Sequence, residues 1–104
     1  MSNNRQKLEL TWIGKNNPEY DIANIEPRIL EEKPDLSHGD QNTENMIIHG
    51  DNLLALKALL PEYEGRIKCI YIDPPYNTDN AFENYNDSVE HSTWLSLMKP
   101  RLQI

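Results

Sequence analysis

An aspartate followed by two prolines and a tyrosine, Asp73 to Tyr76, cuts off a short apolar run and constrains the fold more than any other stretch of the chain. The run at residues 67–72 is apolar with little alternation, which is typical of a strand covered on both faces. Neither proline has an N–H for a sheet ladder, so the strand has to end at Asp73. The pattern predicts an α/β fold with a carboxylate, a stiff turn and a tyrosine at the carboxyl end of a strand. That is the edge where open sheets bind ligands.

These groups are suited to holding a flat aromatic ring that carries an exocyclic NH2 group. Asp73 can accept one N–H, the carbonyl of Pro74 can accept the other, and Tyr76 can lie on the ring. Two acceptors off the ring plane favour a pyramidal nitrogen whose lone pair is free to attack, because they stabilise the positive charge that develops there. In a duplex such a ring would have to be turned out of the stack. For the tetrapeptide alone, a plain strand-ending turn is an equal alternative, since Asp-Pro is a common turn signal.

The preceding residues predict a β-α-β unit. Residues 46–49 form a short apolar strand, and residues 53–60 carry leucines at helical spacing before Pro61 ends the helix. With the strand at 67–72 this gives two parallel strands joined by a right-handed crossover. Asp51 has two interpretations, as the N-cap of the helix or as a functional residue at the same sheet edge as Asp73.

The ends of the chain are less regular. In residues 1–44, Leu8, Leu10 and Trp12 alternate with polar residues, which favours an extended arm; a disordered leader is the alternative. Residues 79–90 are polar and predict a loop that closes over substrate. Ser92 is then the predicted N-cap of a last helix, which Pro100 should kink or restart.

Composition limits the function classes. The formal net charge of −7 and a pI near 4.8 have the wrong sign for a free-standing DNA-binding domain, unless another part supplies the basic residues. The single Cys69 excludes an internal disulfide, and the three scattered histidines give no metal-ligand spacing, so we expect no metal. With no apolar signal core and no membrane-length run, the sequence predicts a soluble cytoplasmic protein.

Four segments together resemble the modification (Mod) subunits of type III restriction–modification systems, DNA adenine-N6 methyltransferases in which the Asp-Pro-Pro-Tyr motif comes first along the chain. The segments are residues 45–53 (NMIIHGDNL), 67–78 (IKCIYIDPPYNT), 82–87 (FENYND) and 94–102 (WLSLMKPRL). Their order and spacing fit that family. The sequence departs from it at Asp79, where glycine is usual, which affects the loop and not the tetrapeptide.

The resemblance implies methyl transfer from S-adenosylmethionine to adenine N6 in double-stranded DNA, on a Rossmann-like methyltransferase fold. The catalytic residues that it implies are Asp73, Pro74, Pro75 and Tyr76. Those implied for substrate binding are Tyr76, Asn77 and Thr78. Asp51 and Asp73 would lie near the methyl donor. The implied partners are duplex DNA, a second Mod subunit and the ATP-dependent restriction (Res) subunit, with no membrane.

A donor site of this kind usually needs a glycine-rich turn, and the four glycines of this chain stand apart. In the family, the Phe-x-Gly-x-Gly donor loop and the target-recognition region lie further toward the C-terminus. We therefore expect residues 1–44 to be an arm and residues 45–104 to be the N-terminal portion of a methyltransferase domain, inactive alone. The alternatives are a cytosine-N4 methyltransferase, which more often has Ser in place of Asp73, and a non-catalytic fragment that binds a full-length partner. A nucleotide-binding β-α-β module is a third, which the lack of a phosphate-cradling loop argues against.

Overall fold

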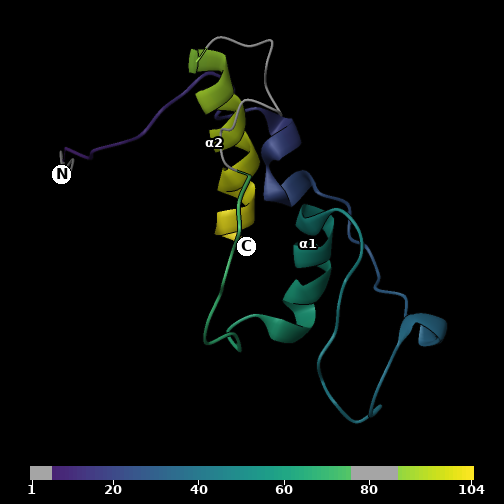
Figure 1. Ribbon diagram of the computed structural model, residues 1–104. Coiled ribbons are helices and arrows are strands. Elements are labelled where there is room, and N and C mark those ends of the chain that lie inside the picture. The colour runs from purple at the N-terminus through teal and green to yellow at the C-terminus, as the bar shows by residue number, and fades with distance from the viewer. Residues whose placement is uncertain (1–5, 76–86) are drawn as a thin grey trace.

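The computed structural model describes residues 6–75 and 87–104, and side-chain burial for residues 6–75 and 91–104. Within these ranges the regular elements are all helical (Figure 1). In chain order they are η1 (Pro18–Tyr20), η2 (Ile22–Asn24), η3 (Pro34–Leu36), α1 (Asn52–Tyr63) and α2 (Asp87–Gln103), the three η elements being 3-10 helices.

Helix α2 is the centre of the structure. It contacts both α1 and η1 (Figure 1), and the two long helices lie on the same side of the wide loop that carries η3. Among the side chains whose burial is described, the buried ones, Ser96, Met98 and Pro100, all belong to α2. The radius of gyration is 17.9 Å, against about 13 Å for a compact domain of this length. Within the described ranges the fold is therefore open, and the side chains that it fully buries come from one helix.

Helix α1 begins where the sequence predicts a cap. Oδ1 of Asp51 accepts hydrogen bonds from the backbone N–H groups of Leu53 (2.9 Å) and Leu54 (3.2 Å). These N–H groups have no partner within a helix, so the carboxylate satisfies them and starts the first turn. The N-cap interpretation of Asp51 is confirmed.

The helix ends later than predicted. Pro61 lies inside α1, which continues to Tyr63. Its fixed φ is compatible with a helix, and what it removes is one hydrogen bond to the carbonyl of Lys57 near the end of the element. Gly65, with φ of +74°, closes the helix instead, and the N–H of Arg66 bonds the carbonyl of Tyr63 at 2.9 Å.

The predicted start of the last helix is also wrong. Helix α2 begins at Asp87, not after Ser92, so residues 87–90 are helical where a loop was expected. Asp and Ser at positions 87 and 88 are residue types that favour a helix N-terminus as much as Ser92 does. Pro100 lies within α2, and the N–H of Ile104 still bonds its carbonyl at 3.3 Å.

The first described part of the predicted arm, from residue 6 to the turn before η1, is attached to α2 and is called the arm from here on. The indole Nε1 of Trp12 donates to Oγ of Ser96 at 2.9 Å, and Nζ of Lys99 donates to the carbonyl of Lys15 at 3.4 Å. The first of the described residues, 6–8, project away from the helices (Figure 1), and Leu8 is fully exposed.

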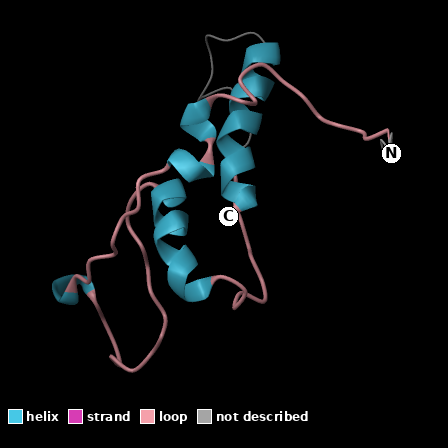
Figure 2. Ribbon diagram, turned by 180° about the vertical axis from the view of Figure 1, so that it is seen from behind, coloured by secondary structure: helices cyan, strands magenta, loops and turns pink. Residues whose placement is uncertain are grey.

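The predicted parallel strands are absent from the part of the chain that the structure describes (Figure 2). Residues 46–49 and 67–72 are neither helix nor strand, and within the described ranges no backbone–backbone hydrogen bond comes from either segment. A strand exists only through hydrogen bonds to a neighbour. The sequence predicts which segments favour extended backbone, and that preference alone does not pair them.

The two segments have the apolar side chains typical of buried strands, but here these side chains are exposed to solvent. Ile47 is 100% exposed, Tyr71 94% and Ile70 77%. A run of exposed apolar side chains with unpaired backbone is a template for another strand.

We predict that the 104-residue chain unfolds with little cooperativity, because it buries so little apolar surface. In a urea titration followed by circular dichroism at 222 nm, the m value should fall below about 1 kcal/mol/M, the lower end for small domains. A steep two-state transition would show that the chain forms a core that this structure lacks.

Candidate active site

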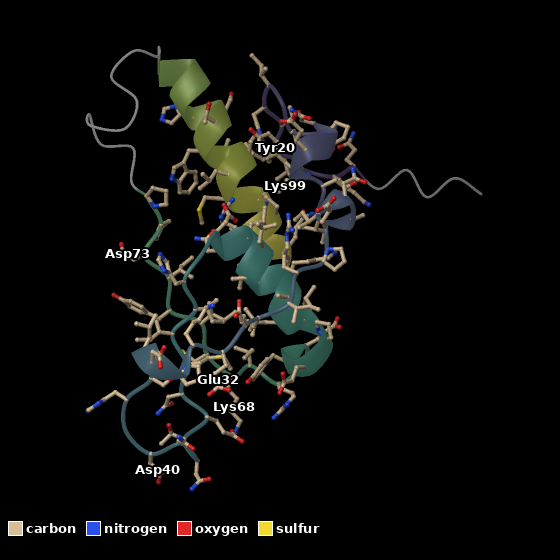
Figure 3. All side chains as sticks on the ribbon, turned by 90° about the vertical axis from the view of Figure 1, so that its right-hand side faces the viewer. Tyr20, Glu32, Asp40, Lys68, Asp73 and Lys99 are labelled. Atoms are coloured by element: carbon tan, nitrogen blue, oxygen red, sulfur yellow. The ribbon has the colours of Figure 1, made fainter. Side chains whose placement is uncertain are left out.

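Asp73 lies on the segment that follows α1 and is exposed. Figure 3 shows it beside the helices, at the opposite end of this segment from Lys68. Within the described part of the chain its carboxylate accepts no hydrogen bond and forms no ion pair. No described residue therefore occupies either oxygen, and the side chain is open to an external N–H donor.

The two prolines after Asp73 differ in their surroundings. Pro74 is half-buried, whereas Pro75 is exposed and its carbonyl accepts a hydrogen bond from the indole Nε1 of Trp94. Trp94 belongs to α2, so this bond joins the Asp-Pro-Pro segment to the central helix. The carbonyl of Pro74 accepts no hydrogen bond within the described residues.

The second predicted site segment is attached to the same helix. Nε of Arg101 donates to Oδ1 of Asn52 at 2.6 Å, and Nη2 of Arg101 is 4.0 Å from Oδ1 of Asp51. The guanidinium also donates from Nη1 to the carbonyl of Leu97 at 2.5 Å, which fixes the side chain against α2. Because the distance to Asp51 is at the limit for an ion pair, the bond to Asn52 is the main link between α1 and Arg101.

Trp94 and Arg101 are seven residues apart on α2. Seven residues are close to two helical turns, so both side chains lie on one face, about 10 Å apart along the axis. No hydrogen bond or ion pair within the described ranges joins Asp51 to Asp73 directly. Helix α2 instead links the two predicted site segments at two points on one face.

Two shallow hollows flank α2. One, of about 200 Å³, is lined by residues 13, 14, 17, 20, 92, 93 and 96. The other, of about 290 Å³, is lined by apolar groups of Leu10, Trp12, Trp94, Met98 and their neighbours. Both are smaller than the ~300–1,000 Å³ typical of ligand pockets. Neither hollow is large enough to enclose a nucleotide.

Positive charge gathers where the arm meets α2. Nζ of Lys15 lies 5.3 Å and Nζ of Lys99 6.0 Å from the centre of the Trp12 ring, and Figure 3 labels Lys99 on α2. Lys15 also bonds Oε1 of Glu9 at 2.7 Å, and this hydrogen bond, with the lysine charge, holds the pKa of the Glu9 carboxyl below its usual value. In a chain with net charge −7, this places two cations against one aromatic ring.

Tyr76, Asn77 and Thr78, predicted to bind substrate, lie outside the described residues. So do Phe82 and Tyr85 of the predicted loop. In residues 6–75 and 87–104, no three potential metal ligands come together, and no helix there has the length and apolar content to cross a bilayer.

Sequence reasoning placed Trp94 on the last helix, but it gave neither Trp94 nor Arg101 a role at the site. The sequence feature that pointed to such a role was the seven-residue spacing, which puts an indole donor and a guanidinium on one face of α2. It was not decisive, because the same spacing is common among side chains that only pack.

Several proteins are similar in sequence to more than half of this chain. The Mod subunit of the probable type III restriction–modification enzyme HindVI, from Haemophilus influenzae, is 57% identical over 61 residues, 59% of this chain. The EcoP15I Mod subunit of Escherichia coli is 31% identical over 134 aligned positions that include 96% of the chain. The chain is homologous to type III Mod subunits. The type II methyltransferase M.KpnI of Klebsiella pneumoniae is also similar, at 36% identity over 70% of the chain.

This Mod homologue spans only a small share of those proteins. It covers 8% of the HindVI Mod subunit, 20% of the EcoP15I Mod subunit and 19% of M.KpnI. No protein-family model matches the sequence. No solved structure matches it either.

We predict that Asp51→Ala weakens the start of α1 by about 1 kcal/mol, because two backbone N–H groups lose their acceptor. The measurement is the helical Cα chemical shift of residues 53–56. Asp51→Asn should keep the helix, since asparagine caps as well as aspartate. Asp40→Ala is the matched control, because its carboxylate accepts the N–H of Asn42 in a loop. Unchanged shifts in Asp51→Ala would mean that packing, not the cap, starts α1.

Proposed function

We propose that this chain supplies the amine-binding turn of a DNA methyltransferase that transfers a methyl group to adenine N6 in duplex DNA. Homology to Mod subunits and similarity to type II methyltransferases support methyl transfer to DNA. The observation that carries the proposal is the exposed Asp73 carboxylate, followed by two prolines of which the second is bonded to α2.

The chemistry follows from the two acceptors. The lone pair of an exocyclic amine on adenine is delocalised into the ring, so the nitrogen is a weak nucleophile. Asp73 and the carbonyl of Pro74 each accept one N–H, which favours a pyramidal nitrogen and stabilises its growing positive charge. Tyr76 stacks on the base once it has been turned out of the duplex. The nitrogen becomes acidic when it is methylated, so no general base is needed.

S-adenosylmethionine supplies an electrophilic methyl group when it is bound. It carries a positively charged ammonium and a ribose with two hydroxyls, and carboxylate oxygens bind both kinds of group. Asp51 fits this chemistry, because its cap bonds use Oδ1 and the side chain is 55% exposed. In this proposal Asp51 would bind the donor while it caps α1, and Asp73 would lie near the donor as it holds the amine.

The proposed fold for the active enzyme is a Rossmann-like sheet. The exposed apolar segments at 46–49 and 67–72 favour it, because they present strand-like side chains with unpaired backbone. We assign them as parallel strands that pair when further strands lie beside them. In that sheet Asp51 and Asp73 would both follow the carboxyl ends of strands.

The proposed partners are duplex DNA, a second Mod subunit and an ATP-dependent restriction subunit, in the cytoplasm. A chain with net charge −7 needs basic residues from elsewhere to bind phosphates. The pair Lys15 and Lys99 is too small a patch to replace them.

We predict that Asp73→Ala lowers methyl transfer about 10²–10³-fold, the usual cost of removing one preorganised partner of a developing charge. The assay uses the product of the complete reading frame that encodes residues 1–104, duplex DNA and S-adenosylmethionine labelled in the methyl group. Calorimetry should show donor affinity nearly unchanged.

Asp40→Ala is the control for this prediction, since Asp40 is an exposed carboxylate on the loop before α1, well apart from Asp73 (Figure 3). Digestion of the labelled DNA to nucleosides identifies the product as N6-methyladenine or N4-methylcytosine. Full activity of Asp73→Ala would refute the proposed role. An equal loss of donor binding and of transfer would make Asp73 a structural residue.

A further inference from the structure

Within the described residues, the Asp-Pro-Pro segment is connected to α2 by the hydrogen bond from the indole Nε1 of Trp94 to the carbonyl of Pro75. The donor and the acceptor are 19 residues apart in the chain. The indole is half-buried and lines the hollow that Trp12 and Met98 also line, so packing holds the ring while its N–H reaches the segment.

The backbone of this segment has little other means of being held. Pro74 and Pro75 have no N–H, so only carbonyl oxygens can take part in hydrogen bonds after Asp73. Within the described ranges, the backbone of residues 67–75 makes no hydrogen bond with other backbone groups. Among the described residues, the hydrogen bond that holds the segment comes from a side-chain donor, Trp94, to a carbonyl.

The two prolines leave the backbone between Asp73 and Tyr76 with few free torsions. The proline rings fix φ of Pro74 and Pro75. A following proline restricts ψ of both Asp73 and Pro74. The residue after Pro75 is Tyr76 and not a proline, so the ψ angle of Pro75 has no such restriction. It sets the direction of the Pro75 carbonyl, the atom that Trp94 binds.

We propose that Trp94 is a positioning residue for amine methylation. By binding the Pro75 carbonyl it attaches this stiff segment to α2, and so fixes where Asp73 and the Pro74 carbonyl lie relative to that helix when they meet the NH2 group. This inference rests on the proposed function. Trp94 touches neither base nor donor in it, and acts only through the segment. Its effect is large because a displacement of about 1 Å of a reacting group can cost about a hundredfold in rate.

The chain offers a matched control. Trp12 also donates its indole N–H, to Ser96 on the same helix, and lines the same hollow. Trp12→Phe therefore removes a comparable hydrogen bond and a comparable volume without touching the Asp-Pro-Pro segment. Trp94→Phe removes the donor at the segment. A second variant replaces Trp94 with 3-benzothienylalanine, which keeps the bicyclic shape and has sulfur in place of N–H.

The first readout does not depend on activity. In the product of the complete reading frame, the carbonyl carbon of Pro75 is observed by NMR through the amide of Tyr76. Loss of the hydrogen bond should shift this carbon upfield in both Trp94 variants and leave it unchanged in Trp12→Phe. An unchanged carbonyl carbon in the Trp94 variants would overturn the tether.

The second readout is methyl transfer to duplex DNA. Both Trp94 variants should lower kcat about 10- to 100-fold, with KM for S-adenosylmethionine unchanged, and Trp12→Phe should keep the wild-type kcat. Equal losses in Trp94→Phe and Trp12→Phe would reduce Trp94 to a packing residue. A carbonyl shift with wild-type kcat would also overturn the positioning role.

The two proposals fail in different ways. If Asp73→Ala retains transfer, the proposed function is wrong, whereas the carbonyl measurement still decides whether Trp94 holds the segment. If Asp73→Ala abolishes transfer and the Trp94 variants match Trp12→Phe, the proposed function stands and the positioning role is refuted.

Discussion

Attachment to a single helix is the constraint on which the described structure depends. The arm, the N-terminus of α1 and the Asp-Pro-Pro segment each reach α2 through a side-chain hydrogen bond, at Ser96, Arg101 and Trp94. The buried side chains described also belong to α2. Hydrogen bonds at partly exposed positions contribute only about 0.5–1.5 kcal/mol each. These hydrogen bonds thus specify how the three segments are oriented on α2, but little apolar burial stabilises the arrangement.

Sequence reasoning succeeded where the cause was local. A cap needs only an aspartate two and three residues before unsatisfied N–H groups, so Asp51 and the start of α1 could be predicted. It failed where several residues could do the same task. Positions 87, 88 and 92 are all capping types, and Pro61 is compatible with both the last turn of a helix and its end. The strands failed for another reason, since pairing needs a partner that residues 46–49 and 67–72 do not have within the described chain.

The same division applies to the candidate site. The identity and exposure of Asp73 follow from a polar residue that ends an apolar run, and the resemblance to Mod subunits is shown by the relatives. The long-range contacts could not be read from the sequence. The hydrogen bonds from Trp94 to Pro75 and from Arg101 to Asn52 depend on how the intervening chain folds in three dimensions. The roles of Tyr76, Asn77 and Thr78 remain predictions, because these residues lie outside the described ranges.

The spacing of Trp94 and Arg101 makes α2 sensitive to length. Each added residue turns everything after it by about 100° around the helix axis. One insertion between positions 94 and 101 would therefore send the guanidinium to a different side from the indole, even if every side chain were kept. The loop that carries η3, before residue 46, has no such phase to preserve. Variation in chain length should thus be tolerated in that loop and be almost forbidden in two turns of one helix.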